Sequence, residues 1–305
     1  NRPTQPLAAG VQVDTHGDAS QPGDDDADWE SKEKEITSLQ ADLRTQNKTI
    51  NRVLSYTRGF FEYLLRKEYC QHNPLKEIPW LPEENFIPFI FSPPQINELI
   101  HATAKRLRIY AKNFVKDLGS YMAILLLARC GMRIYEPLRL QREHFRADDK
   151  TLYIEKTKFK KDRLIPIPTS VATEITNYLS VRRCFWGADT NSYLLAMSKE
   201  KPFYDQFIRW RFHQAVNDIG LKRPRQTIGN TNIAAPTPHS LRHSFAVNTL
   251  KRIKDKGKSP QNALPVLAAY LGHSEYKHTA KYLKMLDANH RHNFVNFINT
   301  QKQAP

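Results

Sequence analysis

An unbroken apolar run, Met122–Ala128, constrains the fold of this chain more than any other stretch. It lies inside a nearly all-apolar segment, residues 114–130, which has no wide polar face to turn toward water. A helix that is apolar on every side is buried, and this run is much shorter than the roughly 20 apolar residues that a membrane span needs. The segment therefore predicts a buried central helix that ends at Gly131.

A proline-rich stretch upstream of that helix predicts a domain boundary. We expect a linker at 82–94, a helical segment at 30–81 and a larger domain at 95–305. Residues 1–29 are rich in Gly, Pro, Ala, Gln and Asp without apolar periodicity, so we expect a disordered acidic tail there. The prolines of the boundary are Pro74, Pro79, Pro82, Pro88, Pro93 and Pro94.

Helical spacing of apolar residues dominates the rest of the sequence. Ser92 to Gln95 has the pattern of a capping box that opens a helix. Residues 151–155 and 163–167 instead resemble strands that flank a basic hairpin loop, KTKFKKD. The predicted fold class is mainly α with a small antiparallel β-sheet (α+β). Other predicted helices lie at 48–68, 171–182, 205–218 and 293–298.

The charge distribution indicates a polyanionic partner. The chain carries +15, and its first 30 residues hold one arginine against seven acidic residues, so the remainder carries +21. Such a body attracts DNA or RNA. Cys70, Cys130 and Cys184 are few and far apart, which favours reduced thiols in a cytoplasmic protein. No membrane anchor or signal-peptide core is recognisable, so no membrane partner is expected.

Residues 237–282 gather the side chains best suited to chemistry. His239, Arg242 and His243 fall within five residues, behind a Thr-Pro pair typical of a helix start. A Leu-Gly-His turn ends at His273, and Tyr282 follows nine positions later. An arginine can hold phosphate oxygens bidentately, and a tyrosine can form a covalent phosphoryl intermediate that conserves the ester energy. The stretch therefore suits phosphodiester cleavage without metal, cofactor or ATP.

Three ordered motifs carry a resemblance to a known family. GMRIYEPLRL, with Arg133 and Glu136, resembles the first arginine box of the tyrosine recombinase (phage integrase) family. HSLRHSFA and LGHSEYKHTAKY match its His-x-x-Arg box and its Leu-Gly-His…Tyr box. The resemblance covers roughly residues 91–285. It implies a site-specific DNA recombinase of a phage or mobile element.

The resemblance also implies a role for each matching residue. Tyr282 would attack the scissile phosphate and form a 3′-phosphotyrosyl link, while Arg133 and Arg242 hold the phosphate oxygens. His239 would assist proton transfer at the tyrosine, and His273 would hydrogen-bond the phosphate. Supporting positions are Glu136, which would orient its arginine, and His243.

A lysine of the basic hairpin completes the set that the resemblance implies. The family uses such a lysine as general acid for the 5′-oxygen, and alignment of the strand 163–167 gives Lys158. Neighbouring basic residues of the loop would contact DNA, as would one face of the helix 48–68, although exposed charges on a helix are usually solvated. The predicted DNA-binding residues are Lys48, Arg52, Arg58, Lys156, Lys160 and Lys161.

The individual residues also have simpler interpretations. Arg133 could interact with a helix C-terminus, and Tyr282 could be a packing residue, with Tyr270 or Tyr276 as the nucleophile. His239 and His243 have the spacing of a zinc pair, but the HExxH signature needs Glu where Ser240 stands, so no metal site is predicted. These alternatives lose weight only because the motifs occur together.

At the level of function, three alternatives follow. The leading one is a recombinase that acts as a homo-tetramer on double-stranded DNA, with a dimer at each site, in the cytoplasm or at the nucleoid of a bacterium. The others are a monomeric type IB topoisomerase-like enzyme and a non-catalytic DNA-binding regulator. Two departures from the family stand out: the segment 30–81 is shorter than the usual core-binding domain, and the stretch before the Leu-Gly-His turn is longer.

Overall fold

The computed structural model describes residues 47–83, 85–108, 110–155, 162–228, 231–273 and 275–286. The chain divides into two compact units, Asn1–Glu84 and Asn85–Pro305. The predicted acidic tail, the start of the 30–81 segment and the helix predicted at 293–298 lie outside the described residues.

The described part of the first unit is a helix, residues 47–66, and a return segment up to residue 83. Asn51 is buried on the helix and exchanges hydrogen bonds with the backbone of Leu81, at 2.8 Å to the carbonyl and 2.9 Å from the amide. Arg58 donates to two further carbonyls of the return segment. Polar side chains of the helix thus satisfy backbone groups that a segment without regular structure would leave unpaired.

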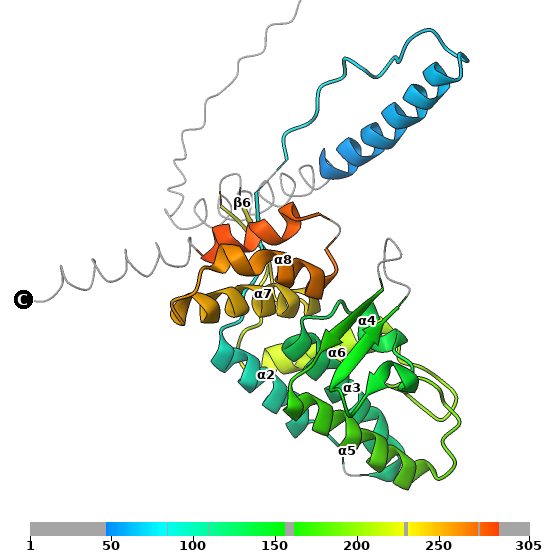
Figure 1. Ribbon diagram of the computed structural model, residues 1–305, viewed down its shortest axis with the longest axis vertical. Helices are drawn as coiled ribbons and strands as arrows, with labels where there is room; N and C mark the ends of the chain where they lie inside the picture. Colours follow the sequence, from blue (N-terminus) through cyan, green and yellow to red (C-terminus); the bar gives the residue numbers. More distant parts are fainter. Residues whose placement is uncertain are drawn as a thin grey trace, which may run out of the picture. The chain divides into compact units, whose positions relative to one another are not determined.

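The second unit is mainly helical (Figure 1), as predicted. The last described helix, residues 277–286, follows α8 after a short turn. In chain order the preceding helical elements are α2 (Pro93–Lys105), α3 (Ala111–Cys130), α4 (Tyr135–Arg139), the 3₁₀ turn η1 (Arg142–His144), α5 (Thr169–Trp186), α6 (Asp205–Asp218), α7 (Pro238–Asp255) and α8 (Pro260–Leu271).

The predicted hairpin is present in a small antiparallel sheet. Its strands are β2 (Phe145–Arg146), β3 (Thr151–Ile154) and β4 (Arg163–Pro166), in the order β2-β3-β4, with Leu152 opposite Ile165. Both of these residues are fully buried, so one face of the sheet covers the core. The loop that joins β3 to β4, with Lys156, Lys158, Lys160 and Lys161, lies outside the described residues.

A second sheet was not predicted. It contains β1 (Asn85–Ile87), β6 (Thr231–Ile233) and β5 (Gln226–Ile228), with β1 parallel and β5 antiparallel to β6. Strands of three residues are too short to show an alternating pattern, and the parallel pair joins segments that are far apart in the sequence. Residues 85–87, which sequence analysis places in the linker, belong to this sheet.

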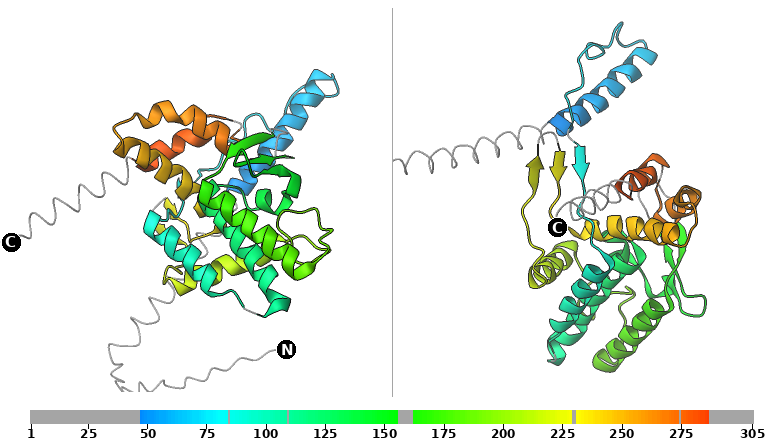
Figure 2. Two further views of the ribbon diagram at one scale, coloured as in Figure 1. Left: turned by 60° about the horizontal axis from the view of Figure 1, so that its bottom comes forward. Right: turned by 90° about the vertical axis from the view of Figure 1, so that its left-hand side faces the viewer.

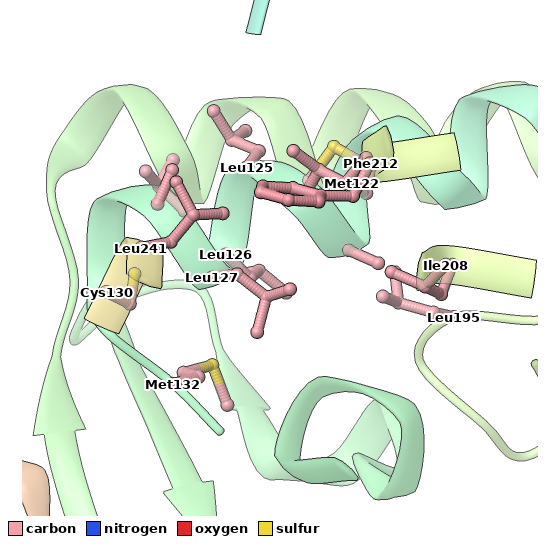
Figure 3. Close-up of a cluster of buried hydrophobic side chains, with 14 of the residues drawn as sticks. Met122, Leu125, Leu126, Leu127, Cys130, Met132, Leu195, Ile208, Phe212 and Leu241 are labelled. Atoms are coloured by element: carbon pink, nitrogen blue, oxygen red, sulfur yellow. The ribbon is translucent and has the colours of Figure 1, made fainter. Parts of the chain in front are cut away.

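Helix α3 is the centre of the second unit, as the apolar run predicts. It contacts α2, α5, α6 and α7, and its residues Met122, Leu126 and Leu127 are fully buried. Figure 3 shows these side chains meeting residues of α6 and α7, among them Phe212 and Leu241. Of the helices in the described chain, none has both the length and the apolar composition to cross a bilayer.

The helix boundaries follow the predicted local signals. Ser92 forms the capping box of α2 with Gln95. Thr237 caps α7, with a proline in its first turn. Gly131 and Gly272 end α3 and α8 with φ of 59° and 65°, in the left-handed region that glycine adopts without steric cost.

Helices α7, α8 and 277–286 lie side by side (Figure 2) and share a smaller hydrophobic cluster. Leu250 of α7, Leu264 of α8 and Leu286 of the last helix are buried in it. The cluster brings the His-x-x-Arg box, the Leu-Gly-His turn and Tyr282 into one region of the second unit.

We predict that Leu126→Ala lowers the free energy of unfolding by about 2–5 kcal/mol, because the side chain is fully buried and its loss leaves a cavity in the core. Urea denaturation followed by circular dichroism measures the change. The control is Val266→Ala on α8, whose side chain is 72% exposed and whose truncation should change stability by less than about 0.5 kcal/mol. Equal losses in the two variants would contradict the central position of α3.

Candidate active site

The C-terminal end of α8 is the point where the site is assembled. The last carbonyls of a helix have no intrahelical partner. Here Arg163 of β4 donates through Nε to the carbonyl of Tyr270 at 2.8 Å. Arg242 of α7 donates through Nη2 to the carbonyl of Leu271. The negative end of the helix dipole thus receives positively charged donors from other elements.

Arg242 is almost completely buried. It is 1% exposed, and its Nη1 donates to the carbonyl of Gly131 at 2.9 Å, so it joins the ends of α3 and α8. Burial, together with the nearby Arg133, lowers the pKa of Arg242 to about 10. The side chain therefore stays charged at neutral pH, and its orientation is fixed by backbone carbonyls that helix ends leave free.

Arg133 lies in the turn between α3 and α4 and remains partly open to solvent. Its Nη2 donates to the carbonyl of Gly272 at 3.0 Å, and its Nη1 donates to Oε1 of Glu136 at 3.0 Å. Its side chain is nevertheless 35% exposed. A guanidinium has five N–H donors, so Arg133 is held firmly while keeping donors for an anion.

Glu136 is the buried carboxylate that joins the arginines. Its Oε2 accepts from the backbone amide of Arg133 at 2.8 Å and from Nη2 of Arg163 at 2.9 Å. Burial acts to raise the pKa of Glu136, but the hydrogen bond and charge of Arg163 outweigh it, and the pKa lies below its usual value. Glu136 is therefore ionised at neutral pH, in the position from which it can orient Arg133.

Arg163 is a site residue that sequence analysis treats only as the start of a strand. Its side chain is 9% exposed, although it lies at the edge of a basic hairpin. The alternation of side chains along a strand indicates that Arg163 is buried. Side chains two apart in a strand share a face, so Arg163 lies on the face of the apolar Ile165, whereas Leu164 between them is 49% exposed. An arginine on the buried face of a strand needs a partner.

Tyr282 lies on the helix 277–286 and is 3% exposed. Its hydroxyl is 3.1 Å from Nδ1 of His243, and its ring packs in the cluster shared by α7 and α8. Burial raises the pKa of Tyr282, against the opposing charges of Arg242 and Arg133. The phenol is therefore protonated at neutral pH and hydrogen-bonded to an imidazole.

The histidines of the boxes surround this phenol. The rings of His239 and His243 meet edge to face with centroids 4.6 Å apart. The ring of His273 is nearly parallel to that of Tyr282, with centroids 6.2 Å apart, and its Nδ1 is 2.7 Å from the hydroxyl of Thr279. Both α7 and the Leu-Gly-His turn thus supply imidazoles to the same cluster.

All three imidazoles have strongly lowered pKa values. Burial of the ring and the neighbouring Arg242 and Arg133 lower the pKa of His239 to about 4, although the residue as a whole is exposed. Burial and the same arginines lower that of His273 to about 3. Burial, His239 and Arg242 lower that of His243 to about 3. At neutral pH the three histidines are therefore in the neutral form.

The competing tyrosines have different surroundings. Tyr270 stacks on Phe245, with ring centroids 5.4 Å apart, and donates its hydroxyl to the carbonyl of Pro166 at 3.3 Å. Tyr276 is 52% exposed. Of these three tyrosines, Tyr282 is the one whose hydroxyl contacts a histidine of the boxes.

The predicted DNA-binding residues of the first unit lie on the helix 47–66. Lys48 and Arg52 are exposed. Arg58 donates to the carbonyls of Leu75 and Ile78 and lies 4.6 Å over the ring of Trp80, so its donors serve the unit itself. Within the described ranges, no group of three or more His, Cys, Asp or Glu side chains is arranged to hold a metal ion.

Comparison with known proteins decides the family. The model of the phage integrase family matches residues 91–289, more than half of the chain. The chain belongs to the phage integrase family. The resemblance that the three boxes carry is thereby confirmed.

Named relatives agree with this assignment. The chain is 30% identical over 232 residues to putative integrase/recombinase y4rB of Sinorhizobium fredii, which covers 75% of this chain and 72% of that protein. It is 32% identical over 228 residues to y4rE of the same organism, with 74% and 69% covered. A tyrosine recombinase of Pseudothermotoga lettingae is 26% identical over 256 residues.

Solved structures show the same fold. The crystal structure of XerA recombinase matches with a TM-score of 0.51 at 20% identity, covering 72% of this chain and 67% of that one. The Tn1549 transposon integrase matches with a TM-score of 0.56 at 18% identity, covering 77% and 74%. The family favours a recombinase, an enzyme that breaks and rejoins DNA, over the topoisomerase-like and non-catalytic alternatives.

We predict that the fold loses stability as the pH falls below 6.5, the ordinary pKa of histidine. The unfolded chain binds protons on these imidazoles below that pH, whereas the folded chain resists protonation until pH 3 to 4. The free energy of unfolding should therefore change little between about pH 7 and pH 8 and fall toward about pH 5.

Urea denaturation at a series of pH values measures this effect. His243→Gln should reduce the decline, because one of the imidazoles that titrates differently in the two states is gone. His101→Gln on α2 is the control, since His101 is exposed. A flat profile between about pH 7 and pH 5 would contradict the neutral state of the cluster.

Proposed function

We propose that the chain cuts and rejoins double-stranded DNA at specific sites through a 3′-phosphotyrosyl link to Tyr282. The observation that carries this proposal is the position of the Tyr282 hydroxyl, 3.1 Å from Nδ1 of His243 and in a cluster with Arg133 and Arg242. A protonated phenol with a neutral imidazole as its partner and fixed cations nearby is equipped for attack on a phosphodiester.

The arginines provide the site for the phosphate. Arg242 and Arg133 would bind the non-bridging oxygens, where an always-charged guanidinium stabilises the negative charge of the transition state. Their contacts to helix-end carbonyls fix both guanidinium groups before DNA binds, so little reorganisation is needed at the moment of reaction. His273 would add a hydrogen bond to the same phosphate.

The reaction is a balanced exchange of esters. The Tyr282 oxygen forms a bond to phosphorus as the bond to the 5′-oxygen breaks, and the phenolic proton passes to an imidazole. The leaving 5′-oxygen takes a proton from Lys158. Because the phosphotyrosine conserves the ester, attack by a 5′-hydroxyl reverses the steps and rejoins the strand without ATP.

His239 and His243 together form the proton acceptor. His243 holds the phenol, and the ring of His239 contacts that of His243. Partial burial and the nearby Arg242 keep the pKa values of both imidazoles low. A bound phosphate brings negative charge, which raises the pKa of both imidazoles and makes them stronger bases when substrate is present. The assisting role predicted for His239 would thus act through His243, because His243 is the imidazole in contact with the phenol oxygen.

The DNA partner follows from charge and family. Residues 31–305 carry a strong positive charge, and the segment 30–81, with Lys48 and Arg52 exposed on its helix, would bind the same duplex as the catalytic domain at 95–305. Lys156, Lys160 and Lys161 would contact the DNA backbone. We propose a homo-tetramer on two DNA sites, with a dimer at each, encoded by a mobile element and acting in the cytoplasm.

We predict that Tyr282→Phe abolishes covalent capture of DNA without weakening binding, because it removes only the nucleophilic oxygen. The DNA target is first enriched by binding from a random-sequence duplex library. A nicked form of the enriched duplex then traps the covalent complex, which denaturing electrophoresis detects, while fluorescence anisotropy measures affinity. Tyr276→Phe is the matched control and should still trap DNA. Capture by Tyr282→Phe, with loss in Tyr276→Phe, would show that the nucleophile is wrong.

We predict that Lys158→Ala slows cleavage by roughly a hundredfold or more, the typical contribution of a general acid. A duplex with sulfur in place of the scissile 5′-oxygen should restore the rate, because a thiolate leaves without a proton. Lys161→Ala is the control. The ratio of its cleavage rates on the sulfur-substituted and normal duplexes should equal the ratio for the wild type. If sulfur rescues Lys161→Ala and not Lys158→Ala, the general acid is Lys161.

A further inference from the structure

We propose that Arg163 is a positioning residue of the recombination reaction, which sets the orientation of Arg133 through Glu136. It also ties the strand that follows the lysine loop to the Leu-Gly-His turn. This inference rests on the proposed function, because it concerns the geometry in which the phosphate is bound and cleaved.

The contacts of Arg163 connect two parts of the site. Its Nη2 donates to Oε2 of Glu136 at 2.9 Å, and its Nε donates to the carbonyl of Tyr270 at 2.8 Å. Its guanidinium also lies against Gly272, where an added Cβ would come within 2.9 Å of Nη1. One side chain thus contacts both the carboxylate that holds Arg133 and the end of α8 that carries His273.

The same carboxylate oxygen accepts from Arg163 and from the backbone amide of Arg133, at 2.9 and 2.8 Å. The second oxygen of Glu136 accepts from the guanidinium of Arg133 at 3.0 Å. A carboxylate held on one side only could rotate toward its remaining partner. With Arg163 in place the carboxylate is fixed on both sides, and so is the guanidinium that it orients.

The charges around Glu136 also support a positioning role for Arg163. The charged groups that face Glu136 are Arg133 from the turn after α3, Arg163 from β4 and Arg242 from α7. The hydrogen bond from Arg163 is the strongest influence that keeps this buried carboxylate ionised. Without Arg163, burial would raise the pKa of Glu136, and a protonated carboxyl cannot accept from Arg133 in the same way.

The side chain of Arg163 is largely shielded from solvent. It is 9% exposed, in contrast to Arg133 at 35%. A purely structural arginine would stabilise the fold and leave the rate of the folded enzyme unchanged. A positioning arginine changes the rate of cleavage while the affinity for DNA, which depends on many phosphate contacts, stays the same. Rate and affinity therefore separate the two roles.

The experiment compares Arg163→Gln and Arg163→Lys with the wild type on the enriched nicked duplex. Single-turnover capture should slow by about tenfold to a hundredfold in Arg163→Gln, the usual cost of misplacing a reacting group, with unchanged anisotropy titrations. Arg163→Lys should lie between, because lysine keeps the charge but cannot bridge two acceptors as a guanidinium fork does. The capture rate of Arg163→Gln should also decline at a higher pH than that of the wild type.

The matched control is Arg211→Lys on α6. Arg211 is buried like Arg163 and pairs with Asp117 at 3.3 Å, in a group of contacts separate from the Glu136 network. This variant should lose thermal stability while its folded fraction captures DNA at the wild-type rate. Glu136→Gln combined with Arg163→Gln should be no slower than the slower single variant, because both changes interrupt the same connection.

Three results would overturn the proposal: a wild-type capture rate in Arg163→Gln, a parallel loss of rate and affinity, or failure of both Arg163 variants to fold, which would assign the residue to the fold alone. Absence of capture by the wild type itself is a different result. It would reject the proposed function, and it is therefore distinguishable from failure of the inference about Arg163.

Discussion

The interaction on which the site depends is the binding of guanidinium groups by the free carbonyls at the end of α8. Arg133, Arg163 and Arg242 carry like charges, and their mutual repulsion would favour separation. Carbonyls of a helix C-terminus, with the dipole behind them, and the ionised Glu136 offset that repulsion. The protein thereby concentrates positive charge at the point where the proposed function requires a phosphate to bind.

The hydrophobic architecture makes this arrangement rigid and sets its protonation state. Helix α3 is buried from Met122 to Ala128 and again at Cys130, next to Gly131, so the carbonyl of Gly131 that holds Arg242 has a fixed position. The smaller cluster of α7, α8 and the last described helix buries Tyr282 against His243. The same burial keeps the phenol protonated and the imidazoles neutral. The packing that fixes these side chains therefore also sets their protonation states, because it creates a low-dielectric environment.

Local signals in the sequence predict much of this structure, whereas contacts between segments that are far apart in the chain could not be predicted. The apolar run, the cap at Ser92, the left-handed Gly272 and the three boxes each depend on residues close together in the chain, and each has the predicted structure. The parallel pairing of β1 with β6 and the contact of Arg163 with Glu136 depend on the fold that brings distant segments together. The partner of the Tyr282 hydroxyl, His243, likewise follows only from the relative position of two helices.

The pairing of β1 with β6 has a mechanical consequence. The second unit begins with Asn85, and that first strand is hydrogen-bonded in parallel to the strand that leads into α7. A little further on, the backbone amide of Phe91 donates to Ser244 of α7 at 2.7 Å, and Asn248 of α7 donates to the carbonyl of Phe91 at 3.0 Å. A load on the start of the second unit would therefore be shared between the β1–β6 hydrogen bonds and the two contacts of Phe91 with α7. The first residues of the second unit are thus tied to α7, the helix that carries His239 and Arg242.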